Sequence, residues 1–215
     1  MTSNQAEKIN FCYVQYGDVI KPLIAEIEAQ CEKLPLQLLN EIRAFNDHIA
    51  RCHYGNPDSA YIDNQIDKAH RHITRITLDC FKALNMILFE QITQYEHQTR
   101  HIDLTVIDSG QFFPLYSRLK REAAGLVYDA KRQEASDVDL ALSLYQDAYN
   151  KYREVTSLIA ANTESTRWAK VKTYSHKGLT ALLWILSVII SALVSMYISC
   201  QGLSQIKYFF TDLID

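Results

Sequence analysis

Residues 178 to 198 read Gly-Leu-Thr-Ala-Leu-Leu-Trp-Ile-Leu-Ser-Val-Ile-Ile-Ser-Ala-Leu-Val-Ser-Met-Tyr-Ile, and no charged residue occurs from Gly178 to Ile206. About 20 apolar residues in an α-helix span the ~30 Å hydrocarbon layer of a bilayer, and a helix there satisfies its own backbone polar groups. A buried core helix of a soluble domain is the alternative, but the rest of the chain is too short to surround one. The run therefore predicts a single transmembrane helix over residues 178–200.

The two flanks of this run differ in charge. Four basic residues precede it, Arg167, Lys170, Lys172 and Lys177, whereas only Lys207 follows it closely. The more basic flank of a membrane helix stays in the cytoplasm, so we expect a single-pass membrane protein with its N-terminal body on the cytoplasmic side. We expect four segments: a cytosolic helical body (1–166), a basic juxtamembrane segment (167–177), the transmembrane helix (178–200) and a short tail across the membrane (201–215).

Small polar residues recur within the apolar run at a spacing of four: Ser187, Ser191, Ser195 and Ser199. Residues four apart lie along one face of a helix, and small side chains there let a second backbone approach closely. Serine in a membrane helix can instead bond back to its own preceding turn. We interpret the row as a surface for self-association in the bilayer.

The body is predicted to be all-α and elongated. Glycine and proline are few, with six and four in 215 residues, which leaves little material for the turns of a β-sandwich or barrel. A first helix is expected from about Asp18 to Lys33, with Pro35 as its break, and a second is expected to end near His53. Pro57 is then placed to open the third helix.

That third helix, about residues 58–100, carries the clearest pattern of the body. Apolar residues follow alternating steps of four and three: Ile62, Ile66, Ala69, Ile73, Ile76, Cys80, Ala83 and Ile87. A heptad sustained this long predicts a coiled-coil seam, packed either within the domain or against another chain.

A helical hairpin is expected over about residues 114–161, with Ser136 as the N-cap of its second helix. The pair resembles a tetratricopeptide-type hairpin. The resemblance rests on six residues, Ala124, Gly125 and Tyr128 in the first helix and Ala141, Tyr145 and Ala148 in the second. The turn between the helices is about four residues too long for that repeat, and no second copy occurs.

Composition and motifs argue against an enzyme. The charge is nearly balanced, with 22 basic and 25 acidic residues, which gives no bulk electrostatic case for nucleic acid. The five cysteines form no close pair, so the ligand spacing of a zinc or redox motif is absent. There is no glycine-rich phosphate loop, nucleophile elbow or His-Glu-x-x-His motif. His97 and His101, with Glu96 beside them, are the nearest approach to a zinc site, but no further ligand cluster completes it. We therefore predict no catalytic residue, metal, cofactor or small-molecule substrate.

The third helix is locally basic, and four of its cations are candidates for binding a partner: Lys68, Arg71, Arg75 and Lys82. Lys68, Arg75 and Lys82 are seven apart, so they follow a stripe away from the apolar seam, and Arg71 lies beside it. Such a stripe can meet phosphates or an acidic protein surface. A solvated helix face is the alternative.

In layout, Gly178–Ile198 following an all-helical body is similar to the small transmembrane effectors of bacterial phage-defence operons of the retron type. That resemblance implies a toxin held inactive by a nucleoprotein, a reverse transcriptase with its DNA and RNA, and released on infection to disrupt the membrane. It transfers no functional residues. The alternative is a membrane-tethered coiled-coil adaptor without toxic activity.

Overall fold

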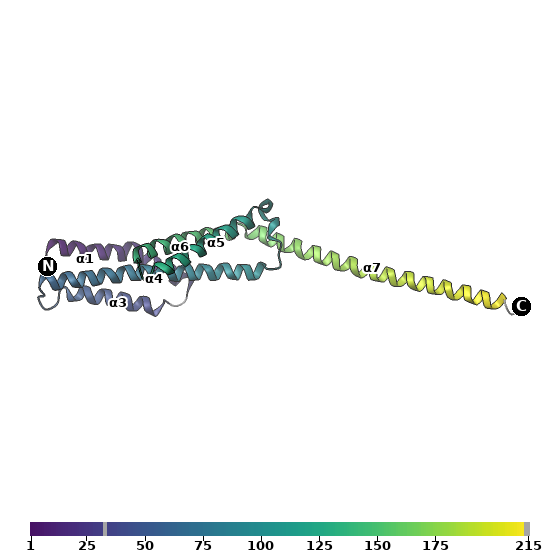
Figure 1. Cartoon of the computed structure of the whole chain (residues 1–215), viewed down its shortest axis with the longest axis horizontal. Helices are drawn as coiled ribbons and strands as arrows, with labels where there is room; N and C mark the ends of the chain where they lie inside the picture. Colours follow the sequence, from purple (N-terminus) through teal and green to yellow (C-terminus); the bar gives the residue numbers. More distant parts are fainter. Residues whose placement is uncertain (32–33, 213–215) are drawn as a thin grey trace.

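The computed structural model describes the backbone of residues 1–31 and 34–212, and the side chains among them except those of 176, 177, 198 and 200–212. The described chain is mostly helical and contains no strand, which confirms the all-α prediction. Helices α1 to α6 form an elongated bundle, and α7 projects from one end of it (Figure 1). In order they are α1 Ser3–Gln15, η1 Tyr16–Ile20, α2 Lys21–Gln30, α3 Leu36–Arg51, α4 Ser59–Thr99, η2 Leu104–Gly110, α5 Phe112–Gln133, α6 Val138–Ala161 and α7 Thr163–Asp212.

The first helical stretch begins at Ser3, so the expected start near Asp18 is wrong. Thr2 and Gln5 form a capping box, and the side chain of Gln5 also donates to the carbonyl and hydroxyl oxygens of Ser59. This stretch was missed because its buried face includes glutamine, whose polar bonds do not register as an apolar period. A π-helical turn, η1, joins α1 to α2 directly before Pro22, whose missing N–H interrupts regular α-helical bonding there.

Helix α4 is the axis of the bundle, and its 41 residues confirm the long helix expected over 58–100. Asp58, rather than Pro57, starts it: the Asp58 carboxylate caps the helix by accepting from the Tyr61 N–H at 2.7 Å. Of the eight heptad residues, seven are buried and Ala83 is half-buried. Helix α4 packs against α1, α2, α3 and α6. The seam therefore packs within the chain.

Helices α5 and α6 pack along each other as the expected hairpin. Asp137 is the N-cap of α6, accepting from the Leu140 N–H at 2.9 Å, so the assignment of Ser136 to that role is wrong. The tetratricopeptide-type positions behave differently in the two helices. Those of α6 are buried, whereas Ala124, Gly125 and Tyr128 of α5 are exposed, so the first half of that pattern does not form a packed interface.

Candidate membrane helix and basic pocket

Helix α7 is one continuous helix of 50 residues that includes both the juxtamembrane segment and the predicted span. Its first turns dock on the end of the bundle. Ala169 is fully buried, the hydroxyl of Thr166 lies 3.2 Å from that of Tyr95, and the Asp103 N–H donates to Thr173 Oγ1 at 3.3 Å. Thr173 is five residues before Gly178, about 8 Å along a helix, so the bundle ends close to the start of the apolar run.

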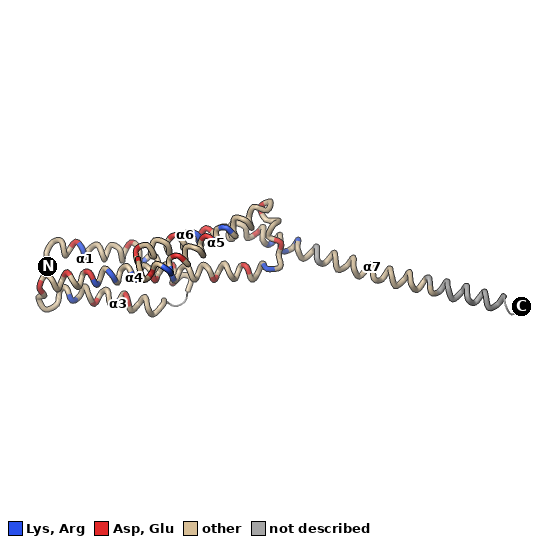
Figure 2. The backbone as a smooth tube through the Cα atoms, viewed as in Figure 1, with Lys and Arg blue, Asp and Glu red and all other residues tan. Residues whose placement is uncertain are grey.

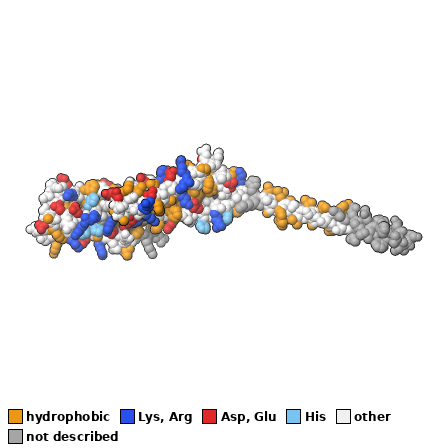
Figure 3. All heavy atoms as spheres, viewed as in Figure 1, with side chains coloured by type: hydrophobic (Ala, Val, Ile, Leu, Met, Phe, Trp, Pro, Cys, Tyr) orange, Lys and Arg blue, Asp and Glu red, His pale blue; other side chains and the backbone are white. Residues whose placement is uncertain are grey.

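Beyond this docking site α7 leaves the bundle, and hydrophobic side chains cover much of the face of this helix that Figure 3 shows. Its described part has the length and composition to cross a membrane, and none of its most apolar window is buried. Exposed fractions reach 69% for Trp184 and 66% for Met196. Figure 2 shows the contrast in charge, with acidic and basic residues mixed over the bundle and absent from the described span.

The four serines of the span are exposed on α7. Ser187 donates to the Trp184 carbonyl at 2.7 Å, so its hydroxyl is satisfied within its own helix. At 3.6 residues per turn, each step of four advances about 40° around the axis, so Ser187 and Ser199 lie about 120° apart. The row is a slowly turning band of small side chains rather than a straight line.

The predicted basic stripe divides into two parts. Lys68, Arg71 and Arg75 line a pocket of about 300 Å³ together with His48 and His72, and these five residues are called the basic pocket below. Lys82 does not belong to it. Its ammonium lies 2.9 Å from a Glu134 carboxylate oxygen and 5.9 Å from the centroid of the Tyr145 ring, so Lys82 is engaged within the chain, and its role in binding a partner stays a prediction.

Polar contacts across the α3–α4 interface hold the two histidines of the basic pocket in place. His48 Nδ1 lies 2.7 Å from the Gln65 side-chain oxygen, and His72 Nδ1 lies 2.6 Å from a Glu41 carboxylate oxygen. The two imidazole rings stack with centroids 5.2 Å apart. The rings are thereby fixed from both helices, with Glu41 engaged by His72.

The three long cations of the basic pocket have no ion pair among the residues that the structure describes. Asp79, one turn beyond Arg75, instead accepts from Gln37 at 3.1 Å and lies 3.9 Å from Lys82. Figure 3 shows Lys, Arg and His side chains side by side on this part of the bundle. The arrangement concentrates unneutralised positive charge around a recess.

Sequence reasoning missed His48, although a signal for it exists. Helices α3 and α4 form an antiparallel hairpin around a turn near residues 54–58. Reflection of the chain about that turn places His48 opposite Gln65 and Glu41 opposite His72, which are the pairs that form. The register of the α3–α4 hairpin would therefore have predicted that His48 of α3 lies beside the basic residues of α4.

A second recess, of about 520 Å³, lies between α4, α5 and α6 and has mainly apolar walls that include Phe89, Tyr128 and Tyr152. At its edge Glu134 accepts from both Lys82 and Tyr145. Burial alone would raise the pKa of Glu134, but the hydrogen bonds from Tyr145 and Lys82 more than offset it and lower the pKa below its usual value. This contact stabilises the position of the α5–α6 turn against α4.

His97 and His101 are exposed near the end of α4, and Glu96 bonds elsewhere, to Lys120 at 2.6 Å and to Tyr116 at 3.0 Å. Within the described part of the chain, no three potential metal ligands come together. The alternative of a zinc site at these histidines therefore gains no support from the fold.

No protein-family model, curated protein or solved structure matches the chain. The fold defines a helical bundle with one long, exposed apolar helix that is suited by length and composition to a membrane. The function is therefore inferred from the residues of this chain.

Proposed function

We propose that this protein is a membrane-anchored toxin of a bacterial antiviral defence system. In this proposal the body lies in the cytoplasm, α7 crosses the inner membrane, and a nucleoprotein complex of reverse transcriptase with its DNA and RNA holds the protein inactive. Release allows copies of α7 to assemble and disrupt the bilayer. The observation that carries the proposal is the fully exposed apolar surface of α7 with its band of serines.

The exposed apolar surface of α7 requires a covering. Burial of one Leu or Ile side chain stabilises by about 1.5–3 kcal/mol, and the span carries many such side chains without a contact to the bundle. Lipid supplies this covering, and within lipid the small residues favour contact with a second helix. Small residues four apart let two transmembrane helices cross at short distance, and Ser187, Ser191 and Ser195 have this spacing.

The docking of α7 gives a physical basis for control by a partner. The contacts at Thr166, Ala169 and Thr173 fix the bundle to the helix, so a partner on the bundle restricts the approach of α7 helices. Packed helices lie about 8–10 Å apart, much closer than the width of a bundle carrying a bound complex. Loss of the partner removes this steric barrier.

The adaptor hypothesis relied on a coiled-coil seam that is free to recruit a partner. Because the heptad residues of α4 are buried against other helices of the same chain, that seam is occupied. An adaptor would have to use another surface, which leaves the effector as the better-supported function.

Inducible expression in a bacterial host without other components tests the proposal. We expect loss of membrane potential and arrest of growth, measured with a potential-sensitive dye and by viable counts. A Leu186→Arg, Ile190→Arg variant should lose toxicity because each charge opposes insertion by about 2.5–3.5 kcal/mol. The matched control Leu186→Ile, Ile190→Leu should retain it. Normal growth with the chain at full abundance in the membrane would exclude the toxin.

A further inference from the structure

We propose that the basic pocket binds backbone phosphates of a nucleic acid. This inference rests on the proposed function and deepens it, because it names the chemistry through which the restraining complex would hold the body. The pocket is lined by His48, Lys68, Arg71, His72 and Arg75, and no carboxylate belongs to its lining. Guanidinium and ammonium groups that lack protein partners are suited to phosphate oxygens.

Two carboxylates near the pocket, those of Glu41 and Asp79, are already engaged. Glu41 is held by His72 at 2.6 Å, and Asp79 is shared between Gln37 and Lys82. Neither pairs with Lys68, Arg71 or Arg75 among the described ion pairs. The three cations therefore keep their charge available for a ligand.

The spacing of the cations fits a polymer with repeated charges. From Lys68 to Arg75 the helix rises about 10 Å at 1.5 Å per residue. In a DNA duplex each strand carries one phosphate per ~3.4 Å of helix axis, so this length corresponds to about three phosphate steps of a duplex strand. A recess of about 300 Å³ flanked by a line of cations can hold one phosphate while the neighbouring cations contact the next ones.

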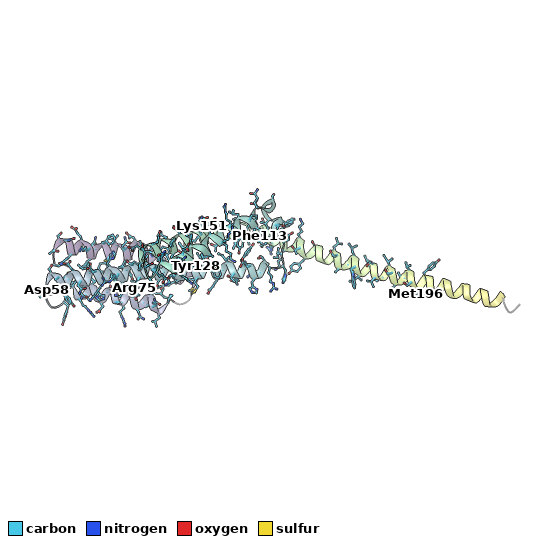
Figure 4. The ribbon with its side chains drawn as sticks, in the orientation of Figure 1. Asp58, Arg75, Phe113, Tyr128, Lys151 and Met196 are labelled. Carbon is cyan, nitrogen blue, oxygen red and sulfur yellow. The ribbon has the colours of Figure 1, made fainter. Side chains whose placement is uncertain are left out.

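The position of the pocket excludes the headgroups of the anchoring membrane as the source of these phosphates. Arg75 lies about 36 Å of helix rise before Thr99, the end of α4 beside which α7 docks. Figure 4 labels Arg75 on the bundle and Met196 far along the projecting helix. Since charge attraction is screened within about 8–10 Å at physiological ionic strength, lipid of that membrane does not reach the pocket.

The test is direct binding of a fluorescein-labelled 20-nucleotide single-stranded DNA to the full chain in zwitterionic nanodiscs, followed by fluorescence anisotropy. The variant Lys68→Ala, Arg71→Ala, Arg75→Ala removes three charges from the pocket. The matched control Arg118→Ala, Arg121→Ala, Arg132→Ala removes three exposed charges from α5. We expect the pocket variant to lose at least tenfold in affinity and the control to stay within about twofold. For the pocket variant, the slope of log affinity against log salt should also become less negative by about 2, because each of the three lost phosphate contacts contributes about −0.7.

Two competitors distinguish the ligand classes. Soluble short-chain phosphatidylglycerol and a poly-glutamate peptide, each at equal charge concentration, should displace the DNA poorly. Equal displacement by the peptide would assign the pocket to an acidic protein, and equal displacement by the lipid would assign it to headgroups; either result overturns the inference. Equal loss of affinity in the two triple variants would also overturn it.

Failure of this inference and failure of the proposed function give different results. The pocket variant does not alter α7, so it should remain toxic when expressed without a partner. Normal DNA binding by the pocket variant would contradict the phosphate-binding inference without contradicting the proposed toxin function. If the wild-type chain is harmless but still binds DNA through the pocket, only the proposed toxin function is contradicted.

Discussion

The hydroxyl oxygens of Tyr95 on α4 and Thr166 on α7 lie 3.2 Å apart, and this hydrogen bond joins the central helix of the bundle to the helix that leaves it. The Tyr95 phenol is protonated at neutral pH, and burial raises its pKa further above the usual value. One turn further along α7, Ala169 is fully buried. The bundle and the apolar helix are therefore coupled by a small, close-packed contact.

Enlargement of Ala169 should weaken this contact. Ala169→Leu adds three carbons at a side chain that is fully buried, and overpacking costs about 1–3 kcal/mol. Thermal unfolding of the full chain in detergent, followed by circular dichroism, should show the bundle destabilised by that amount. Val171→Leu is the control, because Val171 is 64% exposed on the same helix and should change stability by less than about 0.5 kcal/mol. Equal stability of the two variants would contradict the docking.

Truncation of the α4 seam should destabilise the single chain. Ile76 is fully buried, so Ile76→Ala should cost about 2–5 kcal/mol in the free energy of unfolding. Leu36→Ala, at a side chain that is 71% exposed, should have little effect. Because the seam is internal, the melting temperature should not depend on protein concentration. A concentration-dependent melt would point instead to a seam shared between chains.

Glu134 should contribute stability that depends on pH. Its pKa is lowered in the folded state, so the folded protein binds fewer protons there than the unfolded chain does, and the contribution is present at neutral pH. It should be lost as the pH falls below 4.5, the ordinary pKa of a glutamate side chain, and through the lowered pKa. Glu134→Gln should cost about 1 kcal/mol at pH 7, and urea unfolding should show the difference from wild type shrinking as the solution is acidified. A difference that stays constant with pH would contradict this account.

The serine band should decide whether α7 assembles. Ser191→Leu with Ser195→Leu makes the span more apolar, so insertion is preserved while close helix approach is blocked. Under the proposed function, toxicity should be lost at unchanged membrane abundance, measured by fractionation and viable counts. The same serines changed to Ala keep the close approach and should remain toxic if packing is what matters. Full toxicity of the leucine variant would reduce α7 to a tether.

The orientation of the chain has its own test. If the bundle lies in the cytoplasm, protease added to intact spheroplasts should spare it and should remove an epitope tag placed after Asp215. Lysed spheroplasts provide the control, since both parts are then accessible. Digestion of the bundle in intact spheroplasts, at equal abundance, would reverse the proposed topology.

Much of the architecture can be read locally from the sequence because helices encode their own periods. The charge-free run after Gly178 and the heptad from Ile62 to Ile87 are properties of continuous segments, and both appear as single helices. The start at Ser3 was not foreseen because Gln5 is buried through a bond to Ser59, a residue 54 positions away.

The sequence alone determined that the chain is all-α, that its central helix carries one long apolar seam and that an apolar helix follows. The tertiary structure decided which partners those surfaces meet. It buried the seam within the chain, docked α7 through Ala169, and separated Lys82 from Arg75 by pairing Lys82 with Glu134, 52 residues away. The physical reason is range: a helical period is set by neighbours within a turn or two, whereas the pairing of a charge depends on segments that meet only after the chain has folded.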